Sequence, residues 1–186
     1  MNPLSPIEIC NAALIFVGSG LSIDSFEDED AASRACRLQF PQSRREFLDS
    51  DYDFSFATTR STLAKIANTD NWYQLPANMI KPICLAGDDR TNFHIERGLL
   101  YTTQGNPELI FIEDSADLAW YPAKAVSAVQ FILASKLAII LKQDWELARA
   151  LQTQAQSLIS EVAKSDIGNL ELPEFVPYES GLFGER

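Results

Sequence analysis

Few residues of this 186-residue chain have the chemistry for catalysis or metal binding. The single histidine cannot supply a metal-binding triad, and the sequence has no phosphate-binding loop, dinucleotide fingerprint or serine-nucleophile motif. Carboxylates are abundant, and pairs occur at Glu27 and Asp30, Glu113 and Asp114, and Glu171 and Glu174. A glycosidase needs two carboxylates held across a cleft, but 26 acidic residues bring pairs together by chance. We therefore expect no enzyme, no metal and no cofactor.

The histidine and the cysteines have structural interpretations. His94 alternates with Phe93 and Ile95, which predicts a strand whose imidazole points away from the face that those two residues bury. The cysteines are Cys10, Cys36 and Cys84. Their odd number and wide spacing, without a C-x-x-C motif, indicate reduced core thiols, as in a cytosolic protein.

The charge and length limit the class of protein. A net charge of −11 argues against general affinity for nucleic acid, which needs clustered Lys and Arg. The same charge suits a protein that lets DNA pass without binding it. The length favours one domain over residues 1–186. We find no signal peptide, and the longest apolar run, around Val126 to Leu141, falls short of a membrane span.

Residues 5–50 are predicted to form the N-terminal helices. Ser5 and Glu8 have the spacing of a capping box, with proline at the first helical position. The acidic run from Glu27 to Asp30 lies where a second helix begins, and carboxylates are favourable at that end of a helix. Pro41 is expected to kink this helix or to start a new segment.

Residues 51–118 have the texture of strands and turns. Tyr52, Phe54 and Phe56 alternate with polar residues, which predicts an extended segment. Four short apolar runs separated by turn clusters follow, at Met79 to Leu85, Asn92 to Ile95, Leu99 to Thr102 and Leu109 to Ile112. We expect a small antiparallel β-sheet inserted between helices.

Residues 120–167 are predicted to form a helical hairpin. Pro122 opens a helix that is apolar around most of its girth, so it must be wrapped by neighbours, some of them other subunits. Asp144 is expected to cap a fourth, amphipathic helix after a short link. The predicted fold class is α+β, an antiparallel bundle of about four helices with the β-sheet insert and an extended C-terminal arm.

Residues 168–186 form that arm, which is apolar and interrupted by proline and glycine. Pro173 and Pro177 stiffen an extended path and lower the entropy lost on docking. Its candidate partner-binding residues are Phe175, Val176, Pro177, Tyr178, Leu182 and Phe183. Two interpretations stay open, a strap on the chain's own core and an arm that docks on another subunit.

The ordered elements resemble the tail tubular protein A family, the head-to-tail adaptors of short-tailed (podovirus) bacteriophages. The resemblance covers residues 7 to about 165, and the series of motifs carries it rather than any single one. Matching positions in the first part are Asn11, Ala12, Leu14, Gly18, Ile23, Ser25, Asp28, Ala31, Ala35, Cys36, Pro41 and Arg45. The aromatic element at Tyr52 to Ala57 lacks the family's usual Trp, and Asn78 replaces its usual Asp.

The resemblance implies a structural virion protein assembled in the host cytoplasm. Such adaptors form a twelve-fold ring between the portal and the tail nozzle, and DNA crosses the ring without sequence-specific binding. The resemblance leads us to expect the virion neck as the location, portal and nozzle proteins as partners, no membrane, and a monomer before assembly. The alternative is an acidic cell-wall (peptidoglycan) hydrolase associated with the phage tail. A soluble regulatory binding module is a third reading, and strictly monomeric behaviour without affinity for phage particles would favour it.

Overall fold

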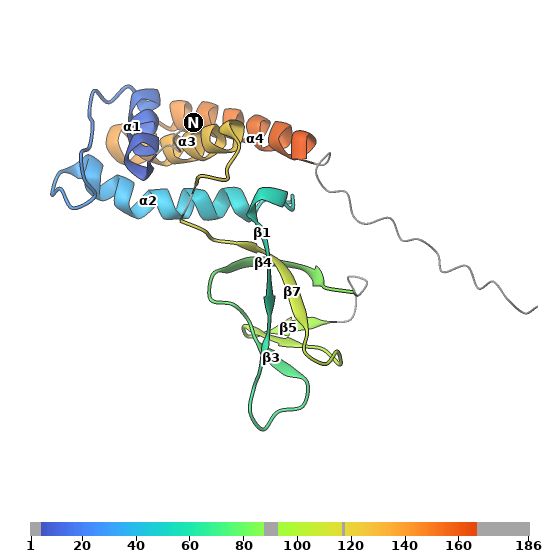
Figure 1. Cartoon of the computed structure of the whole chain (residues 1–186). Helices are drawn as coiled ribbons and strands as arrows, with labels where there is room; N and C mark the ends of the chain where they lie inside the picture. The colour runs from blue at the N-terminus through green and yellow to red at the C-terminus, as the bar shows by residue number, and fades with distance from the viewer. Residues whose placement is uncertain (1–4, 88–92, 117, 167–186) are drawn as a thin grey trace, which may run out of the picture.

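A computed structural model describes residues 5–87, 93–116 and 118–166 and has the α+β fold expected. A layer of helices lies above a β module, which projects from the α2 side of the layer (Figure 1). The helices are α1 (Pro6–Val17), α2 (Ala31–Leu48), α3 (Ala123–Leu137), its π-helical continuation η2 (Ala138–Lys142) and α4 (Trp145–Asp166). The β module follows a 3-10 turn, η1 (Ser55–Ala57), and contains β1 (Thr58–Thr62), β2 (Ala64–Lys65), β3 (Trp72–Gln74), β4 (Met79–Leu85), β5 (His94–Glu96), β6 (Leu99–Tyr101) and β7 (Glu108–Glu113).

Local capping decides where α1 and α2 begin, as the sequence predicted. The Glu8 N–H donates to Ser5 Oγ at 3.2 Å, and the Ser5 N–H donates to Glu8 Oε2 at 2.6 Å. These two bonds complete the capping box. Asp30 Oδ1 accepts from the N–H groups of Ala32 and Ser33 at 2.8 and 3.0 Å. The acidic run therefore caps α2 through its last residue.

Helix α2 continues through Pro41, so the prediction that a new segment starts there is wrong. Proline removes one backbone hydrogen bond from the helix interior. Buried residues on both sides of it, Phe40 and then Phe47 and Leu48, fix the two halves of α2 in the core. Tertiary packing therefore outweighs the local preference of proline.

Helix α3 is enclosed by α1, α2 and α4 of its own chain. Its fully buried residues include Ala125, Ala128, Ile132, Leu133 and Leu137. We expected other subunits to cover part of the apolar surface of α3. For these residues the expectation is wrong, because helices of the same chain already bury them. The apolar pattern of α3 thus reports a core helix.

The segment Ala123–Lys142 is long and apolar enough to cross a membrane by length and composition, contrary to the expectation from the sequence. In the structure, 61% of its most apolar window is buried. A two-residue link joins η2 to α4, and the Leu147 N–H donates to Asp144 Oδ1 at 2.9 Å. The predicted cap and hairpin are therefore confirmed.

The β module contains two small antiparallel sheets rather than the single sheet expected. One sheet has the strand order β1-β7-β4, and the other has the order β2-β3-β6-β5. The predicted extended segment at 52–56 is only partly correct, because Ser55–Ala57 forms η1. Phe54 is buried there and stacks on Phe47 of α2 with ring centroids 4.8 Å apart. Burial of this ring against α2 accounts for the turn.

Candidate contact surfaces

The six partner-binding residues predicted in the C-terminal arm, from Phe175 to Phe183, lie outside the described residues. The structure does show where the arm starts. The Asp166 carboxylate, at the end of α4, accepts from the Ser55 N–H at 2.6 Å and from Ser55 Oγ at 2.5 Å. Asp166 is buried, and β1 begins three residues after Ser55. Asp166, the last described residue, therefore lies beside the start of β1.

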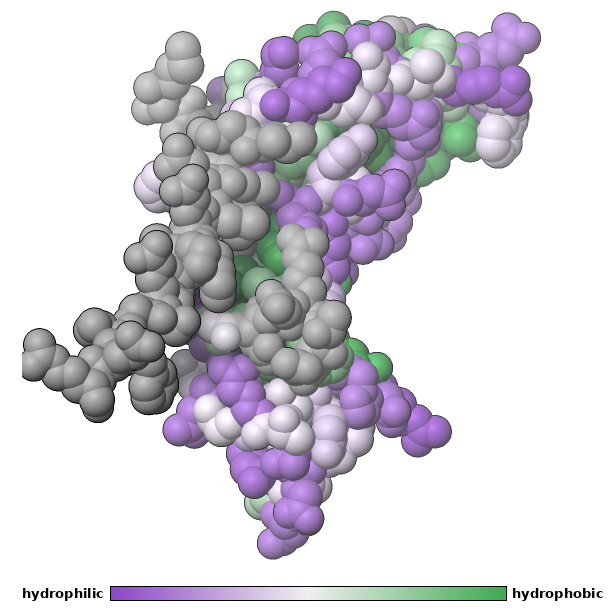
Figure 2. All heavy atoms as spheres, turned by 90° about the vertical axis from the view of Figure 1, so that its right-hand side faces the viewer, coloured by the Kyte–Doolittle hydropathy of each residue, from purple (hydrophilic) through white to green (hydrophobic). Residues whose placement is uncertain are grey.

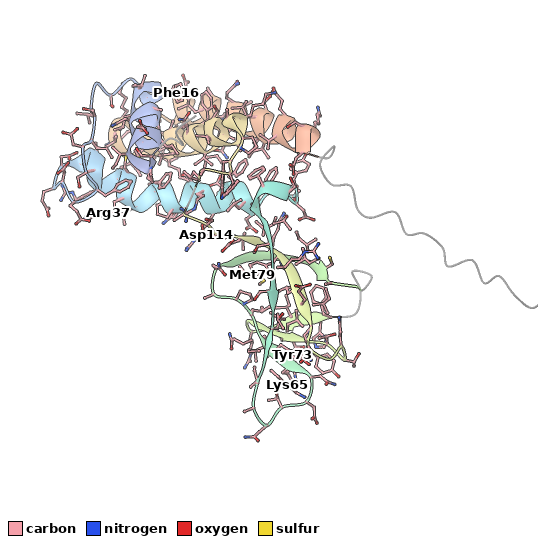
Figure 3. The ribbon with its side chains drawn as sticks, in the orientation of Figure 1. Phe16, Arg37, Lys65, Tyr73, Met79 and Asp114 are labelled. Atoms are coloured by element: carbon pink, nitrogen blue, oxygen red, sulfur yellow. The ribbon has the colours of Figure 1, made fainter. Side chains whose placement is uncertain are left out.

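The carboxylate pair at Glu113 and Asp114 joins the β module to the helical layer. Asp114 accepts from Arg44 Nε at 2.8 Å and from Arg45 Nε at 2.6 Å, and its side chain is only 8% exposed. Glu113 accepts from Asn78 Nδ2 at 2.5 Å. Figure 3 shows Asp114 at this junction, close to the start of β4. Both carboxylates are thus occupied by structural bonds.

The same junction buries a tyrosine and holds a lysine. Burial raises the pKa of Tyr121 to about 12. Lys81 Nζ donates to the carbonyl groups of Ser50 and Tyr52 at 2.5 and 2.8 Å. Beside these contacts, an open groove of about 660 Å³ lies between α2 and the start of β4, and Arg45, Asn78 and Asp114 contribute to its lining.

The other candidate pairs form no shared site. Glu27 is exposed while Asp30 caps α2, and Glu171 and Glu174 lie outside the described residues. Among residues 5–87, 93–116 and 118–166, no group of three or more His, Cys, Asp or Glu side chains is arranged to hold a metal ion.

His94 is exposed, as predicted, but its neighbour Ile95 is 37% exposed and does not face a buried side as expected. The cause is that β5 lies at the edge of its sheet. The imidazole stacks on Tyr101 with centroids 4.8 Å apart and meets the edge of Trp72 at 5.5 Å. Its Nε2 lies 3.7 Å from Glu96 Oε1. This row of rings belongs to the outer face of the second sheet.

The cysteines are free thiols. Cys10 and Cys36 are buried in the main core, as predicted, and Cys84 is only half-buried. The hydrogen bond with Cys36, together with burial, raises the pKa of the Cys10 thiol. The Cys10 thiol therefore stays protonated and acts as a small apolar core group.

Large apolar side chains are exposed on α1, on the loop after it, on η2 and at the start of α4, and we call them together the end patch. Lys142 Nζ donates to the Gly18 carbonyl at 2.7 Å, which joins the end of η2 to the end of α1. The end patch consists of Ile15, Leu21, Ile140 and Trp145, which are 74%, 48%, 49% and 69% exposed. Figure 2 views the molecule from the side opposite to these elements, and from there the helical layer is largely hydrophilic.

A second contact surface is the free edge of β1. The Leu63 N–H donates to the Pro107 carbonyl at 2.9 Å, one step beyond the register that pairs Thr62 with Glu108. In an antiparallel pair of strands, every second residue exchanges two backbone hydrogen bonds with the residue opposite it, and the backbone groups of the residues between point to the other side. The backbone groups of Thr59 and Ser61 therefore point toward β7. Those of Thr58, Arg60 and Thr62 point away from β7. The Thr58 N–H donates to the Ser55 carbonyl at the end of η1, whereas among the described residues no backbone partner pairs with the groups of Arg60 and Thr62.

The two edges of this sheet differ. The β4 edge contains Pro82 and two register irregularities, and Lys81 ties it to the turn after α2. Proline and bulges are the features that prevent edge-to-edge association. Edge β1 has neither proline nor bulge, and three of its five residues are threonines, which favour strands. The β1 edge is therefore open to another strand.

Sequence reasoning missed this edge and the Arg44–Asp114 contact. The threonines of β1 were the available signal for the strand, whereas nothing local links Arg44 to a residue 70 positions away. A comparison with family models finds no match for the chain. A search among curated proteins finds no match either.

Proposed function

We propose that the chain is a structural virion protein, the head-to-tail adaptor of a short-tailed bacteriophage. Twelve copies form a ring between the portal and the tail nozzle, and the ring surrounds part of the DNA channel. The proposal starts from the resemblance of residues 7 to about 165 to the tail tubular protein A family.

The observation that carries the proposal is the presence of two unlike contact surfaces on one chain. The end patch belongs to the helical layer, and the β1 edge belongs to the β module. A ring with more than two copies needs such unlike surfaces, because each subunit meets its two neighbours through different faces. Closure of that head-to-tail contact produces a ring rather than a dimer.

Residues that carry the resemblance also build one local structure. Asn11 Nδ2 donates to the Ile23 carbonyl at 2.9 Å, and the Ile23 N–H donates to Asn11 Oδ1 at 2.8 Å. The Ser25 N–H donates to Asp28 Oδ2 at 3.0 Å. These bonds fix the connection between α1 and α2, so the motif has a structural reason in this chain. This supports the resemblance without depending on a catalytic role.

The charge is compatible with a DNA channel. Twelve copies with a net charge of −11 each would bring about 130 negative charges to the ring. We propose that part of this charge faces the channel, where repulsion eases the passage of DNA. A structure of the ring with a neutral or basic channel surface would contradict this part of the proposal.

Electron microscopy of the protein mixed with the portal protein of the same phage tests the function. We expect twelve-fold rings on the portal and monomers in its absence. A matched variant, Trp145→Ser, removes the exposed indole of the end patch. We expect it to reduce assembly of the twelve-fold ring without unfolding the chain. A protein that stays monomeric on the portal would refute the proposal.

A further inference from the structure

We propose that residues Pro173–Tyr178 of one copy add as an edge strand to β1 of the neighbouring copy. The inference rests on the proposed function, because it names the surface that receives the C-terminal arm in the ring. It also goes further, since it specifies backbone pairing as the mode of binding.

The receiving edge offers unpaired groups in a regular array. The N–H and C=O groups of Arg60 and Thr62 point to the open side of β1, as does the C=O group of Thr58, whose N–H donates to Ser55. The side chains of Arg60 and Thr62 are exposed to solvent. An extended segment can therefore approach β1 and pair with alternate residues.

The prolines of the arm are placed for an edge strand. In a strand, the N–H and C=O groups of residues two apart point to the same side. Pro173 and Pro177 are four apart, so their missing N–H groups share one side. The N–H groups of Glu174, Val176 and Tyr178 occupy the other side and are free to pair. The proline side then faces solvent, which is where proline is tolerated and where it prevents addition of a further strand.

The charges of the two segments are complementary. Arg60 is the charged residue of β1, and its side chain is exposed. Glu171, Glu174 and Glu179 make the arm acidic around the pairing region. Opposite charges on neighbouring strands stabilise a sheet, so Arg60 favours an acidic strand over a basic one.

The geometry of the chain favours a neighbouring copy over the chain's own β1. The arm starts beside Ser55, so in its own chain it runs in the same direction as β1 unless it first passes Thr62 and turns back. The seven steps from Asp166 to Pro173 span at most about 25 Å. Reaching Thr62 uses about 20 Å of that length, and the reversal needs further residues. An antiparallel pair, the more stable arrangement, is therefore formed more readily between copies than within one chain.

Such a contact is head-to-tail, because each copy gives one arm and receives another at β1. Contacts of this kind close into rings or continue as filaments. The arm thus provides a link between adjacent subunits of the ring that adds to contacts made by the helical layer.

Disulfide trapping between two singly substituted chains tests the inference. Full-length Arg60→Cys and Val176→Cys chains are mixed at high concentration without the portal and, separately, on the portal, and then oxidised. We expect a cross-linked dimer of twice the chain mass. Replacing the Val176→Cys chain by Lys164→Cys, which is exposed on α4, is the control and should give none. Absence of the cross-linked dimer under both conditions overturns the inference, as does a cross-link that forms only within a chain carrying both substitutions.

A backbone variant gives an independent readout. Val176→Pro removes an N–H from the pairing side but keeps three side-chain carbons, whereas Val176→Ala retains the N–H and removes more of the side chain. We expect Val176→Pro to lower the fraction of assembled subunits about tenfold relative to Val176→Ala. Equal assembly of the two variants overturns the inference and leaves the adaptor function intact, whereas failure of the unsubstituted protein to form rings refutes the function itself.

Discussion

The helical layer and the β module bury their residues to different degrees. The layer surrounds α3 with three helices, and its core extends from α1 to the aromatic rings of Phe47 and Phe54. The core of the β module is much smaller. It consists of Leu63, Tyr73, Leu75, Leu85, Leu100, Leu109 and Phe111.

The backbones of the helical layer and the β module also differ. The helices of the layer begin at side-chain caps such as Ser5, Asp30 and Asp144. In the β module, Asn68, Asn71, Arg97 and Asn106 have positive φ values, which cost energy in residues other than glycine, whereas the layer has one such residue, Gln143, among those described. The difference teaches that the layer supplies stability, while the β module holds short strands and an open edge in position.

The largest expected effect is loss of an aromatic ring in the layer. Phe47→Ala should lower the free energy of unfolding by about 3–5 kcal/mol, because it leaves a cavity beneath Phe54. Chemical denaturation followed by circular dichroism measures the change. Leu38→Ala, at a residue 62% exposed on the same helix, is the control and should change stability by less than about 0.5 kcal/mol.

A core substitution in the β module should cost less. Leu100→Ala removes a fully buried side chain from the small cluster, and we expect a loss of about 2–3 kcal/mol because its neighbours can partly close the cavity. Hydrogen exchange should show increased opening of β3 and β6 while α3 stays protected. Equal loss of protection in α3 would break the comparison, since the two regions would then unfold as one unit.

The junction between the regions is expected to contribute about 2 kcal/mol. Asp114→Asn keeps the shape of the side chain but leaves the nearly buried Arg44 guanidinium without its counter-charge. Thermal unfolding measures the loss. Arg45→Ala provides the matched control, because Arg45 is 63% exposed and its pairing should contribute less than about 1 kcal/mol.

The smallest effect concerns the cap of α2. Hydrogen bonds from Ser33 and Ala32 lower the pKa of Asp30 below its ordinary value of 3.8. A carboxyl group whose pKa is lowered in the folded state stabilises the fold at any pH above its ordinary pKa. This contribution is lost as the pH falls through the folded-state pKa. Asp30→Asn retains a capping oxygen without the charge. We therefore expect it to unfold like the unsubstituted chain at pH 7 but to lose less stability on acidification, and identical acid profiles would contradict the assignment.

The sequence predicted the parts of the fold that depend on neighbours along the chain. The capping box at Ser5, the cap at Asp144 and the strand at Met79 to Leu85 follow from local rules, and the structure confirms them. The predicted start of a new segment at Pro41 is wrong, because burial of Phe40 and Phe47 outweighs the local preference of proline.

Contacts between distant segments were beyond prediction. The division of the strands into two sheets depends on the pairing of β7 with both β1 and β4. These two strands lie at very different distances from β7 along the chain, so no local pattern predicts the pairing. The contact of Asp114 with Arg44 likewise joins residues 70 positions apart. Of the contact surfaces, composition indicated the apolar arm, whereas the open side of β1 follows only from the register with β7.

Removal of the arm tests most directly whether stability and assembly reside in different parts of the chain. The chain truncated after Asn169 retains every described element, including the Asp166–Ser55 contact. We predict that its thermal unfolding matches that of the full chain, while twelve-fold rings no longer form on the portal. A truncated chain that loses stability but still assembles would contradict the account, because the arm would then be a strap on its own subunit.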